Sequence, residues 1–252
     1  MTLRVLTYNI LLGGEDRLPL IREVIREQRP DVVALLEANS RENATRLAGD
    51  LGLDLVFGDA NSDFHVAWLS RLPVRRAENH RQPIFDKTLL EIEVEWAERP
   101  LHLFAAHLSA GRAEDEPRRA AEVRAILAVL RPLGARAHLL VGDFNAVHPA
   151  DGVAWSRLPW KAAGAYTAAG YRIPRDAIPP LLQAGYVDCY RALHPEASGY
   201  TYKVPDPALR IDYCFASPAL AARLRACDRV TAPPADCASD HLPLYAEFSD
   251  ER

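Results

Sequence analysis

Hydrophobic and polar positions repeat along this chain with two different periods. Apolar residues recur every three or four positions over Leu18–Gln28, which predicts an amphipathic helix that ends before Pro30. Apolar and acidic residues alternate over Thr88–Trp96, which predicts a strand with one buried face. The expected buried face comprises Leu90, Ile92, Val94 and Trp96.

The same two patterns predict most of the remaining secondary structure. Further helices are expected at Asn39–Leu51 and Glu114–Leu130. Further strands are expected at Arg4–Leu11, Asp31–Leu36, His65–Ser70, Leu101–His107, His138–Val141, Tyr200–Val204, Arg210–Ala216, Arg225–Thr231 and Leu242–Phe248. Because strands dominate both halves and helices lie between them, we expect an α/β (α+β) fold of two sheets packed face to face with helices outside. No linker of distinct composition interrupts residues 1–252, so we expect a single domain.

One long segment, Val147–Ser198, follows neither period and is rich in proline, glycine and aromatic residues. It interleaves aromatic with basic side chains: Trp155, Arg157, Trp160, Lys161, Tyr166, Tyr171 and Arg172. Long irregular segments are often functional. Two interpretations stay open: an aromatic-pinned surface loop, or a loop that faces the substrate and offers stacking platforms.

The composition limits the classes of function. Of the 252 residues, 49% are hydrophobic and 25% are charged, as in an ordinary globular protein. The formal net charge of −4 argues against broad binding to a nucleic-acid duplex but leaves room for a local basic patch. No apolar run approaches the roughly 18–20 residues that cross a bilayer, and the residues around Leu3–Leu12 show neither a basic n-region nor an A-x-A-like cleavage site. We therefore expect a soluble, cytoplasmic monomer.

The four cysteines all lie in the last quarter of the chain, and none forms a C-x-x-C pair. They are Cys189, Cys214, Cys227 and Cys237. This spacing does not match a metal site built from thiolates. We expect reduced and mostly buried thiols, and a disulfide such as Cys227–Cys237 is the alternative.

Polar residues gather where the predicted strands begin or end. These groups are Thr7-Tyr8-Asn9, Leu36-Glu37, Ala106-His107, Gly142-Asp143-Phe144-Asn145, Arg210-Ile211-Asp212-Tyr213 and Ser239-Asp240-His241. Loops at strand ends are the usual place for catalytic groups. The carboxylates of Glu37 and Asp240 and the amide of Asn9 suit a hard cation that takes oxygen ligands, Mg²⁺ or Mn²⁺. Taken alone, Glu37 would instead be an acid at a helix N-terminus.

The other members of these groups have the chemistry to handle a phosphate. Asp143 can orient or deprotonate a water, and Asn145 can donate to a nonbridging phosphate oxygen. A carboxylate such as Asp212 would fix the tautomer of His241, and His107 could protonate a leaving oxygen or hold the phosphate. Singly, each has a structural interpretation, such as a turn at Gly-Asp-x-Asn. Together they indicate one catalytic site.

This ordered set, with Ser70-Arg71-Leu72-Pro73, resembles the endonuclease/exonuclease/phosphatase superfamily, which has the DNase I-like fold. The resemblance spans nearly the whole chain. It implies a four-layer sandwich of two mixed β-sheets with helices outside, and a phosphoesterase that depends on Mg²⁺ or Mn²⁺.

The resemblance also implies roles for the residues around the metal. Glu37 would be the principal metal ligand, with Asn9 and Asp240 at or beside the metal. Asp143 would orient or activate the attacking water, and Asn145 would contact the phosphate.

The two histidines receive roles from the same resemblance. Asp212 would hold His241, which acts as a base or stabilises the phosphate, and His107 would lie on the phosphate or leaving-group side. Apurinic-site endonucleases of the family commonly carry Tyr where His107 stands, and their Trp-rich segment is here Gly199-Tyr200-Thr201-Tyr202. Both departures lower the expectation of abasic-site repair. The usual Gln before the metal-binding Glu is here Leu36, which weakens the expected support of that carboxylate.

Four more residues are candidates for contact with the substrate: Arg71, Lys87, Tyr202 and Arg210. Lys87 begins a predicted strand, and it is either a phosphate contact or a solvated lysine.

We expect a metal-dependent phosphoesterase that hydrolyses a phosphodiester by water attack, most simply a nuclease acting on DNA or RNA. The alternative is a phosphatase or phosphodiesterase acting on a small-molecule or lipid-headgroup phosphate. A noncatalytic binding protein on the same fold is disfavoured, because such a protein should have lost one or more of the acidic and imidazole groups. Those groups are all present: Glu37, Asp143, Asp212 and His241.

Overall fold

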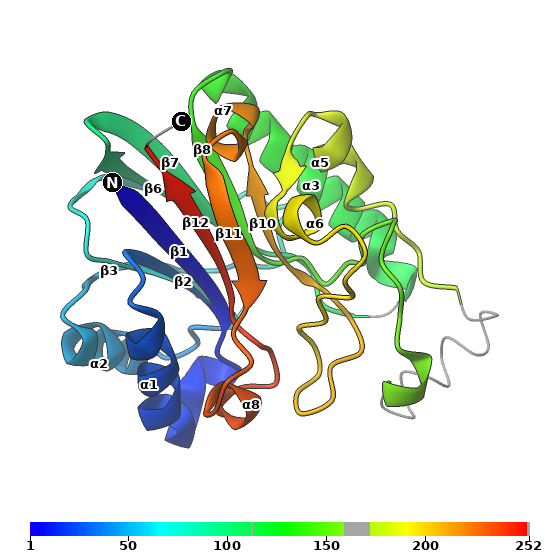
Figure 1. The fold of residues 1–252 in the computed structure, drawn as a ribbon, viewed down its shortest axis with the longest axis horizontal. Helices are drawn as coiled ribbons and strands as arrows, with labels where there is room; N and C mark the ends of the chain where they lie inside the picture. Colours follow the sequence, from blue (N-terminus) through cyan, green and yellow to red (C-terminus); the bar gives the residue numbers. More distant parts are fainter. Residues whose placement is uncertain (112, 159–171, 251–252) are drawn as a thin grey trace.

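Two β-sheets lie face to face in this protein (Figure 1). The computed structural model describes residues 1–111, 113–158 and 172–250. Within these residues the first sheet has six strands, in the spatial order β11 (Leu224–Arg229), β12 (Leu244–Ser249), β1 (Thr2–Asn9), β2 (Val32–Leu36), β4 (Val66–Ser70) and β3 (Asp54–Gly58). The second sheet also has six, in the order β5 (Val74–His80), β6 (Leu89–Trp96), β7 (Arg99–His107), β8 (His138–Asp143), β10 (Asp212–Ala216) and β9 (Val187–Asp188). Both sheets are mixed, because β1–β2 and β7–β8 are parallel and the other pairs are antiparallel.

Helices cover the outer face of each sheet, so the molecule has four layers (Figure 1). The first sheet is covered by α1 (Leu18–Gln28), α2 (Arg41–Leu51) and α8 (Ala235–Ala238). The second sheet is covered by α3 (Glu116–Leu130) and α5 (Pro179–Gln183), and α6 (Cys189–Leu193) and α7 (Pro218–Ala221) pack against β10. Short 3₁₀ turns are η1 (Leu12–Arg17), η2 (Ala113–Asp115), η3 (Arg131–Leu133) and η4 (Trp155–Arg157).

An apolar core fills the space between the sheets. The first sheet contributes side chains such as Val32 and Trp68, and the second contributes Leu103 and the apolar face of β6. The alternation predicted for this strand is confirmed, since its four expected residues all point into the core. Burial of such side chains is the main driving force that holds the two sheets together.

Helix α1 matches its predicted range residue for residue. Pro19 is tolerated in its first turn, where the backbone N–H has no helical partner. Arg29, with φ 47°, ends the helix in the left-handed region just before Pro30. Ile21 and Val24 face the first sheet, as the apolar spacing predicts.

Strand register brings the polar strand ends of the sequence together. In the parallel pair β1–β2, Asn9 lies opposite Leu36, so Glu37 follows directly beside it. In the second sheet Asp143 on β8 has one neighbour on each side, His107 on β7 and Asp212 on β10. The carboxyl ends of the parallel strands β1, β2, β7 and β8 meet here, and so does the start of the antiparallel strand β10. Residues far apart in sequence therefore converge at this place.

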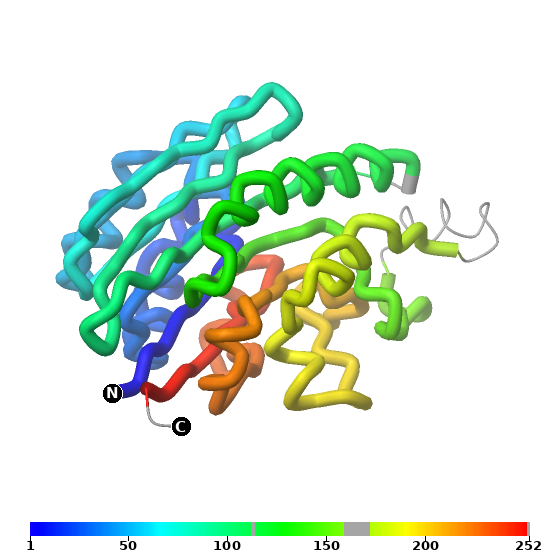
Figure 2. Tube along the Cα trace, turned by 90° about the horizontal axis from the view of Figure 1, so that it is seen from above, coloured from blue at the N-terminus to red at the C-terminus, as the bar shows by residue number. Residues whose placement is uncertain are grey.

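The first and last strands bring the two termini side by side, at the end of the sandwich opposite to these polar residues (Figures 1 and 2). Strands β1 and β12 pair antiparallel, with Thr2 opposite Ser249. The N-terminal amine of Met1 is bound by the carboxylate of Asp250.

Several expected elements differ from those observed. The strand expected at Tyr200–Val204 is wrong: this segment turns back on itself, with Tyr202 and Leu209 exchanging backbone hydrogen bonds, and Pro205 cannot donate one to a sheet. Strands β3, β5 and β9 were not expected. Strand β5 is an exposed edge strand rich in charged residues, so it lacks the alternation that reveals a strand.

The cysteines are all free thiols, and the alternative disulfide Cys227–Cys237 is not formed. Cys227 is buried on β11, whereas Cys237 is exposed on α8. Within the described part of the chain, no helix is both long and apolar enough to cross a membrane. Of the expected aromatic loop, Trp160, Lys161, Tyr166 and Tyr171 lie outside the described residues.

Candidate active site

Asn9 joins carboxylates that come from the two different sheets. Its Nδ2 donates to Glu37 Oε1 (3.2 Å) and to Asp143 Oδ2 (3.0 Å), and its Oδ1 accepts from the N–H of Leu11 (3.0 Å). The side chain is buried, and its backbone oxygen accepts from Ser239 Oγ (2.7 Å). An amide nitrogen does not bind a cation. In this orientation the Nδ2 of Asn9 holds the carboxylates of the two sheets together, and its Oδ1 accepts from Leu11. The expectation that Asn9 lies at or beside the metal stays a prediction.

Glu37 is partly exposed at the end of β2, and both its carboxylate oxygens are held. Oε1 accepts from Asn9 and Oε2 accepts from the N–H of Leu12 (3.0 Å). The backbone of Glu37 has φ 55°, a left-handed conformation that is costly for a residue with a Cβ. Strain of this kind is common where a side chain must point in a particular direction. Although Leu36 stands in place of Gln, the carboxylate of Glu37 is supported, because Asn9 and the N–H of Leu12 both donate to it.

Asp143 is buried at the end of β8. Its Oδ1 accepts from the backbone N–H of Asn145 (2.9 Å) and its Oδ2 accepts from Asn9. Burial raises the pKa of Asp143 to about 7, even though the positive charge of His241 acts in the opposite direction. A carboxylate with this pKa can both accept and release a proton near neutral pH.

His241 is oriented by a carboxylate. Its Nδ1 lies 2.9 Å from Asp212 Oδ2, and its Nε2 lies 3.7 Å from Asp143 Oδ2. Burial alone would lower the pKa of His241, but the charges of Asp212 and Asp143 outweigh it and raise the pKa to about 10. The imidazole is therefore protonated at neutral pH. These three residues each bring one potential ligand atom within 4.8 Å of the others.

His107 faces the same carboxylate from the other side. Its Nε2 lies 3.5 Å from Asp143 Oδ2, and its Nδ1 is buried with no hydrogen-bond partner among the described residues. Burial, with the positive charges of Lys87 and His241, lowers the pKa of His107. One imidazole of the site is thus neutral and the other is charged. The ring of Phe64 packs edge-on against His107.

Lys87 is buried beside this histidine, so the interpretation as a solvated lysine is wrong. Its Nζ donates to the backbone oxygen of Leu108 (3.0 Å) and lies 2.9 Å from Asp86 Oδ2. The same Leu108 oxygen accepts from Asn145 Nδ2 (3.3 Å). Lys87 therefore lies next to the residues expected to bind phosphate.

Asp240 and Tyr202 lie at the outer side of this cluster of polar residues. Asp240 is partly buried, and its Oδ2 lies 3.9 Å from Lys203 Nζ. The ring of Tyr202 packs on His241, with 4.8 Å between ring centroids. Asn145 has φ 47°, a left-handed conformation that Asn tolerates better than most residues. All the expected catalytic and metal-site residues thus lie at one end of the sandwich.

Two expected substrate contacts do not lie at this site. Arg210 is fully buried, and its guanidinium is bound by Asp151 (2.7 Å) and Asp188 (2.7 Å), so no substrate reaches it. Arg71 follows the end of β4 that lies beside Asp31, whereas Glu37 lies at the opposite end of β2. Both were inferred from motif positions, which carry no information on burial or strand direction.

Some contacts of the site had no signal in the sequence. The N–H of Leu12 belongs to η1, and Phe64 lies in the loop before β4. Neither residue is polar, so neither was marked by the pattern of polar residues at strand ends. A hollow of about 250 Å³ next to Asn145 and Tyr202 was also not expected. Its lining is mainly apolar and includes Ala110, Val147, Leu158, Ile173, Leu209 and Ile211.

Solved structures share this architecture over nearly the whole chain. An AP endonuclease from Archaeoglobus fulgidus is 20% identical, with a TM-score of 0.73, and covers 98% of this chain and 99% of its own. The 3′ phosphatase NExo from Neisseria, bound to a product DNA hairpin, is 22% identical, with a TM-score of 0.77 and coverage of 98% and 99%. The human Nocturnin catalytic domain with a bound sulfate anion is 20% identical, with a TM-score of 0.75 and coverage of 98% and 93%. At these identities the likeness establishes the fold alone, the DNase I-like α/β sandwich.

The sequence itself carries the family. Residues 6–241 match the Endonuclease/Exonuclease/phosphatase family. The chain belongs to this family and is a phosphoester-hydrolysing enzyme. A comparison with curated protein sequences found no match.

Proposed function

We propose that this enzyme is a divalent-metal-dependent phosphodiesterase, and specifically a nuclease that acts on DNA or RNA. The observation that carries the proposal is the meeting of acidic, amide and imidazole groups from both sheets around Asp143. Asn9 and Glu37 come from the first sheet, and His107 and Asp212 come from the second.

The charges of the site fit a divalent cation. Glu37, Asp143 and Asp212 are close together, and within the residues that the structure describes no lysine or arginine forms an ion pair with any of them. Carboxylate oxygens are the ligands that Mg²⁺ and Mn²⁺ favour. We infer that Glu37, with Asp240 beside it, would hold the ion. Such an ion would neutralise charge on the phosphate and on the leaving oxygen.

We infer that Asp143 would activate the attacking water. Its pKa of about 7 lets it accept a proton at neutral pH while Asn9 and the N–H of Asn145 hold its orientation. A group fixed in this way needs no rearrangement at the moment of reaction.

The phosphate is expected to bind between His241 and Asn145. Asp212 keeps His241 protonated, so its Nε2–H can donate to a nonbridging oxygen. The amide of Asn145 supplies a second donor. His107 is neutral and can donate a hydrogen bond without placing a second charged imidazole beside the first.

Nucleic acid is supported as the substrate class by two of the structural neighbours. The Neisseria 3′ phosphatase was solved with a DNA hairpin, and the Archaeoglobus neighbour is an AP endonuclease. One observation favours a second candidate, a phosphatase or phosphodiesterase for a small substrate. The mainly apolar hollow of about 250 Å³ beside Asn145 would suit a compact apolar leaving group.

Nicking of supercoiled plasmid, with Mg²⁺ or Mn²⁺ added, tests the proposal. We expect wild type to nick the plasmid. We expect Asp143→Asn and His241→Ala each to lower the rate by at least about 100-fold. The first removes the group that accepts the proton of the attacking water, and the second removes the charged donor to the phosphate. Arg71→Ala is the matched control and should keep wild-type activity, since Arg71 lies at the other end of the sheet.

Equal activity in wild type and Asp143→Asn would overturn the proposed mechanism. No nicking by wild type, with turnover of a phosphomonoester or lipid phosphodiester instead, would favour the second candidate. Salt dependence separates the two, because binding to a phosphate backbone weakens steeply with salt and small-substrate turnover does not.

A further inference from the structure

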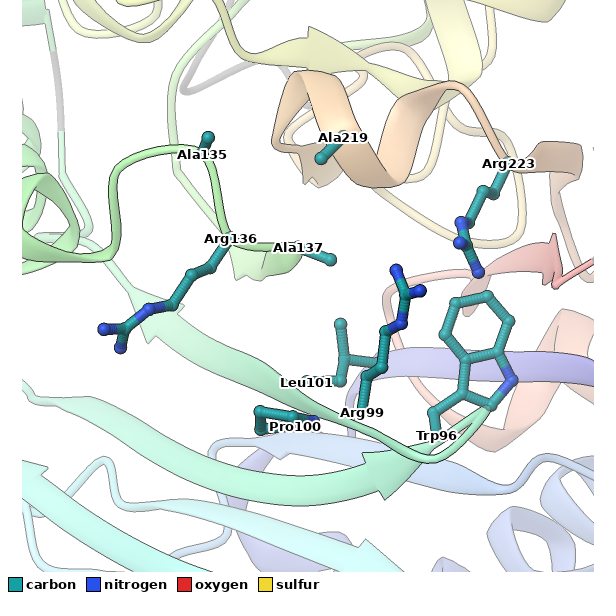
Figure 3. A pocket seen from close by; sticks show the side chains of 9 residues that line it. All are labelled: Trp96, Arg99, Pro100, Leu101, Ala135, Arg136, Ala137, Ala219 and Arg223. Carbon is teal, nitrogen blue, oxygen red and sulfur yellow. The ribbon is translucent and has the colours of Figure 1, made fainter.

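A second hollow lies at the end of the sandwich away from the catalytic groups. It has a volume of about 300 Å³ and lies between the start of β7, the turn before β8 and α7 (Figure 3). Strand β7 runs from Arg99 at this hollow to His107 in the catalytic cluster, so the length of the strand separates the two places. The proposed hydrolysis therefore does not use this hollow.

Three arginines line the hollow, and none of its lining residues is acidic. Figure 3 shows Arg99 and Arg223 extending into the same space beside Trp96, whereas the side chain of Arg136 extends away from them. The guanidinium carbon of Arg223 lies 5.4 Å from the centroid of the Trp96 ring. Guanidinium groups that share one hollow repel one another unless an anion lies between them. Arginine is also the side chain best suited to bind an oxyanion with two parallel hydrogen bonds.

The described part of the chain supplies no carboxylate partner to these three arginines within ion-pair distance. Arg75, another arginine at this end of the second sheet, is paired with Glu95 at 3.2 Å. The hydrogen bond with the N-terminal amine of Met1 is the main cause that lowers the pKa of Asp250, and the charge of Arg223 adds a smaller effect. The chain as a whole has a net charge of −4. A local concentration of unpaired positive charge in such a chain favours a negatively charged ligand.

The floor of the hollow is apolar. Trp96 and Leu101 are buried there, and Pro100, Ala137 and Ala219 surround them. We propose that the hollow binds a small organic anion, in which a phosphate-type oxyanion is joined to a compact apolar ring. Arg99 and Arg223 would bind the oxyanion, and the apolar floor would bind the ring. A volume of about 300 Å³ is at the lower end of the range for ligand sites, about 300–1,000 Å³.

Phenylphosphonate is a suitable probe for this site. It joins an oxyanion to a ring through a C–P bond, which a phosphoesterase does not cleave. Calorimetric titration of the whole protein in metal-free buffer should show one saturable site that binds phenylphosphonate more tightly than inorganic phosphate. Arg99→Gln and Arg223→Gln should each weaken binding about tenfold, because each removes a charge-assisted hydrogen-bond donor. Arg75→Gln is the matched control and should bind as wild type does.

Two more variants separate this hollow from diffuse surface charge and from the catalytic site. Ala219→Leu keeps all three arginines but fills part of the hollow, and it should also weaken binding about tenfold. Asp143→Asn alters only the catalytic cluster and should bind normally. Circular dichroism checks that each variant is folded. The proposal is overturned if phosphate binds as tightly as phenylphosphonate, if Ala219→Leu binds as wild type, or if Asp143→Asn abolishes binding.

Discussion

Buried charge is used in two ways at the level of single residues. Arg210 is held by the two buried aspartates Asp151 and Asp188, and Asp151 also binds Arg191, so two permanent cations face two carboxylates. His241 lies between Asp212 and Asp143, where the cation can lose its proton and one carboxylate has a pKa of about 7. The first arrangement holds the fold, and the second can move protons. Pairs of groups whose pKa values are pushed apart by their surroundings are typical of catalytic sites.

A third cluster allows a test of pH dependence. On the outer face of the second sheet Glu91 accepts from two imidazoles, with His80 Nε2 at 2.8 Å and His102 Nδ1 at 2.9 Å. Burial would raise the pKa of Glu91, but the hydrogen bonds from His102 and His80 outweigh it and lower the pKa from 4.5 to about 2. A lowered folded-state pKa means that the stabilisation is full above about pH 4.5 and is lost as the pH falls toward 2.

Urea unfolding of wild type and Glu91→Gln between pH 3 and pH 7 checks this. At pH 7 we expect wild type to be more stable by roughly 1.5–3 kcal/mol, the usual range for hydrogen bonds to a charged group. The difference in the free energy of unfolding should shrink as the pH drops below about 4.5. A difference that stays constant with pH would show that the charge of Glu91 contributes nothing.

Residue types at the site were predictable, but side-chain orientation and burial were not. Acidic, amide and imidazole groups next to apolar runs predicted that Glu37, Asp143 and His241 would lie in one place, because strand ends converge in an α/β sheet. The same signal could not show that Asn9 turns its nitrogen toward the carboxylates or that Lys87 is buried. Those properties depend on contacts between residues far apart in sequence.

At the level of elements, the end of β8 depends on one glycine. Gly142 has φ 141°, and a Cβ at this position would lie 1.8 Å from the backbone oxygen of Ala106 on β7. Strands β7 and β8 are parallel neighbours, and the next pair in register is His107 opposite Asp143. Close approach of the two backbones therefore positions two site residues at once.

Substitution of this glycine should affect stability and activity together. We expect Gly142→Ala to destabilise the protein by about 2 kcal/mol or more, because both the backbone angle and the contact with Ala106 are unfavourable. Activity should fall even at temperatures where the variant is folded. Gly49→Ala in α2 is the matched control: a Cβ there meets nothing within 4 Å, so we expect stabilisation by about 0.5–1 kcal/mol. Thermal unfolding and a phosphoesterase assay measure both effects, and wild-type behaviour of Gly142→Ala would contradict the expectation.

Elements with a strong period were predicted well, and those without one were not. Helix α1 and strand β6 each bury one continuous face, so burial dictates their pattern. Strand β5 lies at an edge with little burial. In Tyr200–Val204 aromatic and apolar residues alternate with Thr201 and Lys203, as in a strand, yet the segment turns back and packs Tyr202 on His241. The local spacing of apolar residues indicates which side chains are buried, and it does not by itself distinguish a strand from a packed loop.

At the scale of the whole molecule, the site exists only where the two sheets meet. Asn9 on β1 reaches Asp143 on β8, and Asp212 on β10 reaches His241 just before β12. A cation bound by these carboxylates would bind only when the sheets are packed together. Ligands that bind only the folded state raise its stability.

Thermal unfolding with and without metal tests this link. Saturating Mg²⁺ or Mn²⁺ should raise the Tm of wild type by roughly 5 °C, on the scale expected for binding about 100-fold above Kd in a chain of this length. Glu37→Gln should lose most of this increase. Glu23→Gln, an exposed glutamate on α1, should keep it. An equal increase in all three proteins would place the metal elsewhere.

The pairing of β1 with β12 has a practical consequence for handling the protein. Both chain ends emerge together, and the length of β1, on the order of 20 Å, separates them from Asn9. An affinity tag or fused fluorophore at either end would therefore stay clear of the substrate. It would instead lie near Asp250, whose pKa is lowered in part by the charge of Arg223 in the arginine-lined hollow. Proteins used to measure ligands of that hollow are best prepared with both ends cleaved free of added sequence.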